Sequence, residues 1–227
     1  MIGIFDSGDG GLAALYELRK KRPNVDAVFF ADRRNAPYGT KTKKEITRLT
    51  ARAVHKLLNA GAEKVLIACC TASTVHQSLP PFLKERSLPI IAPTSKEASL
   101  RTVNGRVGII STKATADSGA FEKSLAHYEN VNLVYTKPMQ ELVSFVEKGE
   151  RDGCLENDFK NWLYESLYIF KERNIDTLIL GCTHFGHLER EISFVLPGVK
   201  IINSAKEGAR EIIKYTSPYG RGTTLYL

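Results

Sequence analysis

The 227 residues fit one large domain or two small ones, and 43% hydrophobic against 25% charged residues exclude wholesale disorder and fibrous repeats. The longest apolar runs are too short to cross a bilayer and no apolar signal region follows Met1, so we expect a cytoplasmic protein without membrane contact. The net charge of +7 favours anionic partners, but the densest basic stretches, 19–22 and 41–44, lack zinc-finger spacing and RNA-binding aromatic motifs, so we expect no nucleic-acid partner.

Short β-branched runs alternate with amphipathic helical stretches along the chain. The clearest helix covers residues 43–59, where apolar residues recur at helical spacing before Gly61. Near-continuous apolar strands separated by helices are typical of a parallel sheet covered on both faces, so the sequence predicts the α/β class. The expected strands are residues 2–5, 27–30, 65–68, 90–92, 107–110, 133–135, 177–180 and 200–202.

Two parts of the chain share a pattern that indicates an internal duplication. Residues 2–7 (IGIFDS) resemble residues 107–112 (VGIIST), each an apolar strand with glycine in second place. Later in each half, an apolar strand ends in cysteine and threonine, at 65–71 (VLIACCT) and at 178–183 (LILGCT). Either similarity alone is compatible with chance, but the paired order favours two pseudo-symmetric lobes with a cleft between them.

The boundary between the lobes is expected where Pro89 and Pro93 interrupt the pattern. We assign residues 1–93 and 200–227 to the first lobe, because a last strand and helix near 201–215 are expected to return to it. Residues 94–199 form the second lobe. The tail from Ser217 onward carries no structural signal.

The two cysteine motifs place thiols at the carboxyl ends of expected strands, where open α/β sheets bind ligands. Free amides at the start of the next helix stabilise a thiolate or a substrate carboxylate, and Thr71 and Thr183 add hydroxyls there. One such cysteine is more often a small packing residue, but two in matching positions favour function. Inverting a stereocentre needs a base on each face of a carbon, whereas a cysteine hydrolase needs no second thiol. Racemisation or epimerisation therefore fits better.

Disulfides and zinc are weaker interpretations of the cysteines. A chain of this length without a signal peptide has no need of a disulfide framework, so we expect free thiols. Adjacent cysteines orient poorly around one tetrahedral ion and no CxxC pair occurs, so we expect no metal. The four cysteines are Cys69, Cys70, Cys154 and Cys182. The candidate zinc ligands are Cys69, Cys70, Cys182 and His184.

Four motifs in a fixed order carry a resemblance that spans nearly the whole chain. They are IFDSGDGGL at 4–12, AD leading to PYG at 31–39, ACCTAS at 68–73 and LGCTH at 180–184. Together they resemble the glutamate racemases of the aspartate/glutamate racemase superfamily. The resemblance implies cofactor-independent interconversion of L- and D-glutamate, which supplies D-glutamate for the peptidoglycan of the bacterial cell wall. It also points to a homodimer as a candidate state, because dimers are common in the family.

The resemblance implies a role for each residue of the site. Cys69 deprotonates the D-enantiomer and Cys182 the L-enantiomer, while Asp6 and His184 assist in handling the protons. The substrate, glutamate or a related acidic amino acid, would be held by Ser7, Pro37, Tyr38, Gly39, Cys70, Thr71, Thr115, Thr183 and Glu147. Some of these residues also have a purely structural interpretation: a turn-forming Asp6, a Tyr38 held by its tight turn, a helix-capping His184 and an exposed Glu147.

Two residues depart from the family pattern. Cys70 stands where asparagine is usual, and a thiol forms weaker hydrogen bonds than an amide. Asp9 adds a negative charge beside Asp6, which disfavours an acidic substrate. We therefore expect one of three roles for Cys70. It changes the substrate specificity, it is a redox-sensitive partner of Cys69, or it marks a paralogue with little racemase activity. The alternatives are an aspartate or broad-specificity racemase, or a non-catalytic paralogue that binds an amino acid.

Overall fold

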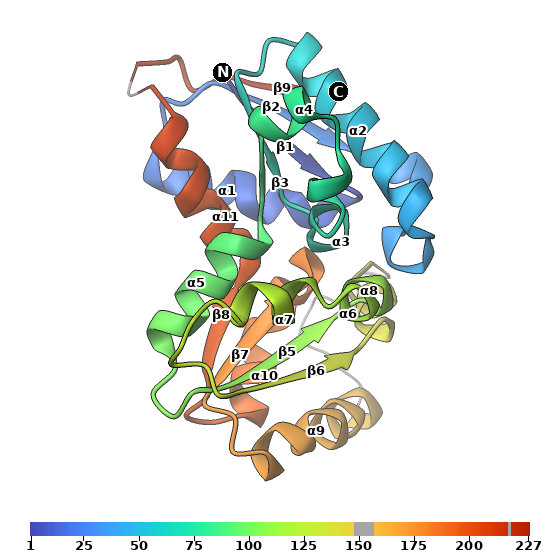
Figure 1. The fold of residues 1–227 in the computed structure, drawn as a ribbon, viewed down its shortest axis with the longest axis vertical. Helices are drawn as coiled ribbons and strands as arrows, with labels where there is room; N and C mark the ends of the chain where they lie inside the picture. The colour runs from blue at the N-terminus through green and yellow to red at the C-terminus, as the bar shows by residue number, and fades with distance from the viewer. Residues whose placement is uncertain (148–156, 218) are drawn as a thin grey trace.

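The computed structural model describes residues 1–147, 157–217 and 219–227, except for the side chains of residues 147, 157 and 158. Two lobes lie one above the other, each built around one sheet whose paired strands are all parallel (Figure 1). The first sheet has the order β4-β3-β1-β2-β9 and the second the order β6-β5-β7-β8. The strands are β1 (Ile2–Asp6), β2 (Ala27–Ala31), β3 (Lys64–Ile67), β4 (Ser87–Pro89), β5 (Arg106–Ser111), β6 (Leu133–Pro138), β7 (Thr177–Gly181), β8 (Lys200–Asn203) and β9 (Thr224–Tyr226).

The two sheets repeat one strand order. The order β4-β3-β1-β2 in the first sheet corresponds, strand by strand, to the order β8-β7-β5-β6 in the second. Strands β3 and β7, which precede the two cysteine motifs, therefore hold the same place beside the central strand of each sheet. The α/β class and the two pseudo-symmetric lobes that the sequence predicts are confirmed.

Helices cover both sheets and fill the joint between the lobes (Figure 1). Helices α5 and α11 pack on one another, and α11 also packs on α1, so this group lies between the two sheets. None of the described helices is long and apolar enough to span a bilayer. The α-helices are α1 (Leu12–Lys21), α2 (Lys43–Asn59), α3 (Cys70–Ser73), α4 (Pro81–Glu85), α5 (Ile91–Arg101), α6 (Lys113–Ser118), α7 (Ala120–Leu125), α8 (Glu141–Glu147), α9 (Asn157–Glu172), α10 (Glu189–Val195) and α11 (Ser204–Ile212).

Three expectations about the elements need correction. The expected strand at 90–92 is the start of α5, while the strand itself is β4, three residues earlier. Pro93 fits the first turn of α5 because the backbone N–H that proline lacks has no partner there. The strand at 200–203 pairs with β7 in the second sheet, so it lies in the second lobe and not in the first. The tail adds β9 beside β2 in the first sheet.

Helix α2 begins at a complete capping box. The Thr42 side chain accepts a hydrogen bond from the Glu45 backbone, and the Glu45 carboxylate accepts one from the Thr42 backbone at 3.0 Å. The buried face of α2, which includes Leu49, Ala53 and Leu57, packs against the first sheet. The helix predicted at 43–59 is confirmed with the same bounds.

We expect Thr42→Ala to destabilise the protein by about 1 kcal/mol, because it removes the side-chain acceptor at the helix N-terminus. Thr47→Ala is the matched control, since the Thr47 hydroxyl donates to the Lys43 carbonyl within the same helix. Its effect should stay within about 0.5 kcal/mol. Urea unfolding of both variants checks this, and equal losses would contradict a capping role.

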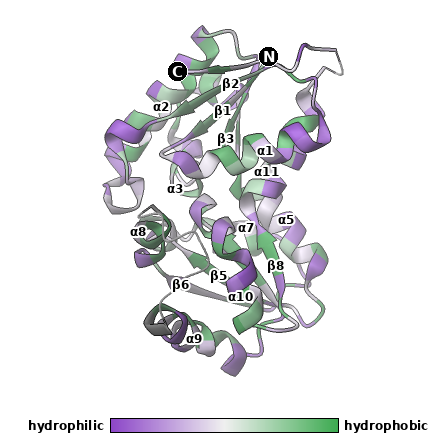
Figure 2. Cartoon of the chain, turned by 180° about the vertical axis from the view of Figure 1, so that it is seen from behind, coloured by the Kyte–Doolittle hydropathy of each residue, from purple (hydrophilic) through white to green (hydrophobic). Residues whose placement is uncertain are grey.

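A continuous hydrophobic cluster joins the lobes. It contains Ile4 of β1, Ile90 beside α5, Ile109 of β5, Ile179 of β7 and Ala209 of α11, all fully buried. Figure 2 shows hydrophobic residues along the strands and hydrophilic residues on the outer surfaces of the helices. The sheets are therefore held through a shared core at the joint, which includes Cys70, while Cys182 and Cys69 each belong to a hydrophobic cluster of one lobe.

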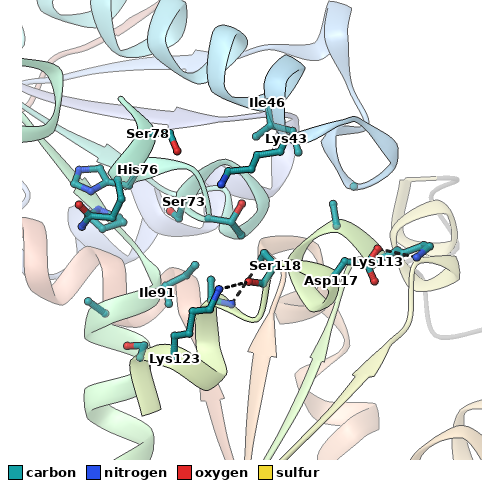
Figure 3. Close-up of a pocket in the computed structure, with 18 of the residues that line it drawn as sticks. Lys43, Ile46, Ser73, His76, Ser78, Ile91, Lys113, Asp117, Ser118 and Lys123 are labelled. Carbon is teal, nitrogen blue, oxygen red and sulfur yellow. Dashed lines mark hydrogen bonds and ion pairs between the residues drawn. The ribbon is translucent and has the colours of Figure 1, made fainter. Parts of the chain in front are cut away.

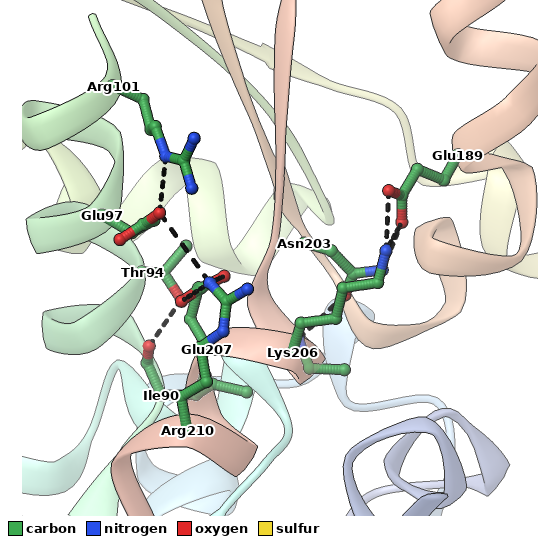
Figure 4. Close-up of polar contacts among 10 residues, drawn as sticks. Ile90, Thr94, Glu97, Arg101, Glu189, Asn203, Lys206, Glu207 and Arg210 are labelled. Carbon is green, nitrogen blue, oxygen red and sulfur yellow. Dashed lines mark hydrogen bonds and ion pairs between the residues drawn. The ribbon is translucent and has the colours of Figure 1, made fainter. Parts of the chain in front are cut away.

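Ion pairs at the surface of the joint tie α11 to its neighbours (Figure 4). Arg210 contacts Glu207 within α11 at 2.7 Å and Glu97 of α5 at 3.8 Å. On the other side of α11, Lys206 contacts Glu189 of α10 at 2.8 Å. Burial raises the pKa of Glu207, and Arg210 partly offsets this. These contacts hold α11 against α5 on one side and against α10 on the other.

Candidate active site

The two cysteines of the repeated motifs line one cavity from opposite lobes. Cys69 follows β3 and Cys182 follows β7, and their exposed fractions are only 6% and 7%. The cavity has a volume of about 20 Å³, which is room for about one water molecule. Its lining consists of Ser7, Gly8, Ala36, Pro37, Tyr38, Gly39, Cys69, Cys70, Thr71, Thr112, Gln140, Val143, Cys182, Thr183 and His184.

Cys69 is the N-cap residue of α3. Its Sγ accepts a hydrogen bond from the Ala72 backbone amide at 3.4 Å and lies 3.2 Å from the Ser7 hydroxyl. Burial, and then the charge of Asp6, raise the pKa of Cys69 to about 11, although these two hydrogen bonds favour the thiolate. The group is therefore a thiol at neutral pH and needs a proton acceptor before it can act as a base.

Cys182 has a histidine beside it. Its Sγ lies 3.8 Å from Nδ1 of His184, which follows it in the 3₁₀ helix Thr183–Leu188. Burial raises the pKa of Cys182 well above its usual range, while the His184 backbone amide acts in the opposite direction. Both cysteines are thus buried thiols with a polar neighbour within reach of sulfur.

Asp6 connects the two halves of the site. It ends β1, is fully buried, and accepts hydrogen bonds from the Gly8 backbone at 2.8 Å and from the Thr183 hydroxyl of the second lobe at 3.1 Å. Burial raises its pKa to about 7, because these hydrogen bonds only partly compensate for lost hydration. Its charge in turn raises the pKa of Cys69 and Cys182. A carboxyl group with this pKa exchanges protons at neutral pH.

Tyr38 is held in place by an acid of the first lobe. Its hydroxyl donates to Asp32 Oδ2 at 2.7 Å, and Asn35 donates to the same carboxylate at 2.9 Å. Burial, and then the hydrogen bond and charge of Asp32, raise the pKa of Tyr38, so the phenol keeps its proton. Tyr38 lies in the tight turn that the sequence predicts, and its hydrogen bond to Asp32 also orients it.

Hydroxyl groups meet across the cleft beside the cysteines. The Thr71 hydroxyl of the first lobe lies 2.9 Å from that of Thr112 and 3.0 Å from that of Thr115, both in the second lobe. Thr112 is also the N-cap residue of α6. These hydroxyl groups satisfy one another across the joint between the lobes.

The structure brings most of the residues expected in the site together. Eight of them line the cavity with the two cysteines: Ser7, Pro37, Tyr38, Gly39, Cys70, Thr71, Thr183 and His184. Asp6 and Thr115 contact this lining through Thr183 and Thr71. Glu147 is the last residue of α8, and its side chain lies outside the described part of the chain.

Gln140 and Thr112 line the cavity but were not predicted as site residues. Gln140 precedes α8, and its Oε1 accepts a hydrogen bond from the Lys113 backbone at 3.3 Å. It lies against Gly39 of the opposite lobe, where an added Cβ would come within 3.1 Å of its amide carbon. No motif marks Gln140, whereas a threonine before the helix at 113–118 is an N-cap signal that identifies Thr112.

The two departures from the family pattern have partners of their own. Cys70 is buried, and its thiol donates to the Ser204 hydroxyl at 3.3 Å at the start of α11. Asp9 forms an ion pair with Arg33 at 2.6 Å, so its charge is partly offset near the site. Among the described residues, no cluster of three or more His, Cys, Asp or Glu side chains is arranged to hold a metal ion.

The chain is similar to several known proteins over most of its length. The model of the Asp/Glu/hydantoin racemase family matches residues 14–212. A glutamate racemase of Aquifex aeolicus (strain VF5) is 36% identical over 225 residues, which cover 98% of this chain and 85% of the relative. The crystal structure of a glutamate racemase isoform from Bacillus anthracis has a TM-score of 0.88 at 27% identity, covering 100% of this chain and 86% of the other.

A second solved structure contains a ligand. The glutamate racemase of Francisella tularensis, in complex with D-glutamate, has a TM-score of 0.86 at 27% identity, covering 99% of this chain and 86% of the other. The match of the family model and the coverage of the relatives extend over both lobes and both cysteine motifs. The resemblance expected from those motifs is confirmed, and the chain belongs to the Asp/Glu/hydantoin racemase family.

Proposed function

We propose that this protein racemises glutamate without a cofactor, with Cys69 and Cys182 as the two acid–base groups. The observation that carries the proposal is that both thiols line one cavity, each from the matching strand end of its own lobe. The relatives named glutamate racemases, one of them with D-glutamate bound, support the choice of substrate. The proposal includes a cytoplasmic role in supplying D-glutamate for peptidoglycan, and a homodimer as the assembly.

In the proposed reaction, a proton leaves one face of the α-carbon and another arrives on the opposite face. From D-glutamate, the Cys69 thiolate removes the α-proton and the Cys182 thiol donates its own proton to the other face, which leaves L-glutamate, a Cys69 thiol and a Cys182 thiolate. The reverse reaction exchanges these roles. Asp6 and His184 then assist the return of each sulfur to its starting protonation state, because both lie close to the thiols.

Substrate entry requires the lobes to move apart. The cavity of about 20 Å³ holds about one water molecule, which is far less than an amino acid requires. Separation would also free the hydroxyls of Thr71, Thr112 and Thr115 from one another. We infer that these hydroxyls, with Ser7 and Thr183, bind the carboxylates and the amino group of the substrate.

The decisive experiment follows the α-proton in deuterated water. Purified protein is incubated with L- or D-glutamate, and separately with L- or D-aspartate, without added cofactor; NMR and chiral chromatography then follow exchange and inversion. We expect exchange and inversion of both glutamate enantiomers. Faster inversion of aspartate would assign the protein to aspartate, and binding without exchange of any substrate would identify a non-catalytic paralogue.

We expect Cys70→Asn to lower the KM for glutamate by about 2- to 10-fold, because an amide supplies a stronger hydrogen bond than a thiol. Steady-state kinetics of the forward and reverse reactions check this. Ser204→Ala is the control, since it removes the partner of Cys70 while leaving the thiol in place. A fall in kcat/KM of Cys70→Asn, without such a fall in Ser204→Ala, would instead assign a specific function to the thiol.

A further inference from the structure

Gln140 lines the cysteine cavity but has no part in the proton transfers. It precedes α8 in the second lobe and lines the cavity together with both cysteines. Among the described residues of this lining, Gln140 carries the one side-chain amide, and none is lysine or arginine. Apart from His184, which lies beside Cys182, the lining therefore offers neutral donors to the second carboxylate of an acidic amino acid.

Several other side-chain donors of this lining already have acceptors within the protein. The residues that donate in this way are Tyr38, Cys70 and Thr183. Ser7 lies 3.2 Å from the Cys69 sulfur, so its hydroxyl belongs to the end of the cavity where the α-carbon reacts. The Gln140 amide is the group left for a carboxylate further along the side chain of the substrate.

The Gln140 amide has a defined orientation and unused donors. Its Oε1 accepts a hydrogen bond from the Lys113 backbone at 3.3 Å, so Nε2 and its two N–H groups lie on the other side of the amide. Nε2 has no partner among the described residues. The Lys113 ammonium is itself paired with Asp117 at 2.7 Å (Figure 3). Because Gln140 and Lys113 belong to the same lobe, their hydrogen bond is kept when the lobes move apart.

Gln140 and His184 lie toward different ends of the cysteine cavity. A cavity of about 940 Å³ adjoins one end, where it shares Gly39, and Lys113 also lines it (Figure 3). Gln140 packs against this Gly39, since an added Cβ would come within 3.1 Å of its amide carbon. A different cavity of about 370 Å³ shares His184 and Gly8. A substrate whose α-carbon lies beside the cysteines therefore extends its side chain toward Gln140.

We propose that the Gln140 amide binds the side-chain carboxylate of the amino acid and so selects acidic over neutral substrates. This rests on the proposed function, because it places the α-carbon between Cys69 and Cys182. Nε2 donates charge-assisted hydrogen bonds to the carboxylate, while Oε1 stays bonded to the Lys113 backbone. A substrate with a carboxamide side chain, such as glutamine, turns one acceptor and one donor group toward Nε2 and therefore binds more weakly.

The test compares the affinities for D-glutamate and D-glutamine, measured by isothermal titration calorimetry on the whole protein. Gln140→Glu keeps the length of the side chain, and one of its oxygens can still accept the Lys113 hydrogen bond. The other oxygen then faces the carboxylate of D-glutamate, whose affinity should fall at least ~10-fold. D-glutamine can donate its amide to the new carboxylate, so its affinity should change less than about 3-fold.

Gln77→Glu is the matched control, because Gln77 lines the cavity of about 940 Å³ and not the cysteine cavity. It adds the same charge, and both affinities should change less than about 3-fold. Thermal unfolding shows that each variant is folded. An unchanged ratio of the two affinities in Gln140→Glu, or an equal loss of D-glutamate binding in Gln77→Glu, would overturn the role of Gln140 alone. If the unmodified protein bound neither amino acid, the proposed function would be wrong as well.

Discussion

Replacing Cys182 with alanine is expected to lower the rate of glutamate racemisation by at least about 10²- to 10⁴-fold, the usual contribution of a positioned acid–base group. The variant keeps Cys69, which still removes the α-proton of D-glutamate and can return a deuteron to the same face. D-glutamate should therefore exchange its α-proton in deuterated water without inversion, and L-glutamate should not exchange. NMR of each enantiomer with the purified variant measures both results.

Cys69→Ala provides the mirror-image control. It should lose racemisation to a similar extent but retain exchange of L-glutamate alone, because Cys182 acts on the other face. Thermal unfolding shows that both variants remain folded before their rates are compared. If either variant kept the full racemisation rate, or if both retained exchange of the same enantiomer, the two-thiol mechanism would be wrong.

The strand pattern predicts most of the fold because parallel strands buried on both faces are continuously apolar. The pattern fails where local signals conflict with tertiary context. The run at 90–92 is apolar, but it starts α5, since Pro93 suits the first turn of a helix. The strand at 200–203 lies in the second sheet because it pairs with β7, a choice of partner that no local pattern encodes. Strand β9 has only three residues and belongs to a tail without periodicity.

The sequence predicts the site only where chemistry lies in a contiguous motif. Cys69 follows a strand of the first sheet, and Cys182 and Thr183 follow a strand of the second, so their positions at the carboxyl ends of the two sheets follow from topology. Gln140 reaches the cavity from a loop, and nothing in its neighbours marks it. The partner of Cys70 is Ser204, 134 residues further along the chain, and only the packing of α11 brings the two together. Contacts of this kind depend on the whole fold.

Asp6→Asn is expected to change both stability and activity over the same pH range. The pKa of Asp6 is about 7 in the folded protein, against 3.8 for an ordinary aspartate. A raised pKa of an acid means that the folded state favours the protonated form. The stability from this group is therefore complete below about pH 4 and is lost as the pH rises toward 7. The difference of about three pKa units between the folded and unfolded states corresponds to about 4 kcal/mol of unfolding free energy.

The asparagine variant lacks this titration, so its stability relative to the wild type should increase between pH 4 and 7 and then remain constant. Urea unfolding of both proteins at several pH values measures this difference. If the difference in unfolding free energy between the two proteins did not change with pH, Asp6 would not titrate in this range. Asparagine keeps the shape of the side chain and can still accept the Gly8 hydrogen bond, so packing is nearly unchanged.

Activity should respond in the opposite direction. The Asp6 carboxylate is the form that accepts a proton, so the wild-type kcat should rise as the pH passes 7, and the variant should lose this rise together with about 10²-fold in rate. The pH–rate profiles of both enantiomers check this. An unchanged profile would assign Asp6 a structural role through Gly8 and Thr183 alone. Because burial raises the pKa and ionisation supplies the base, the same carboxyl group lowers stability in the pH range where it becomes useful for proton transfer.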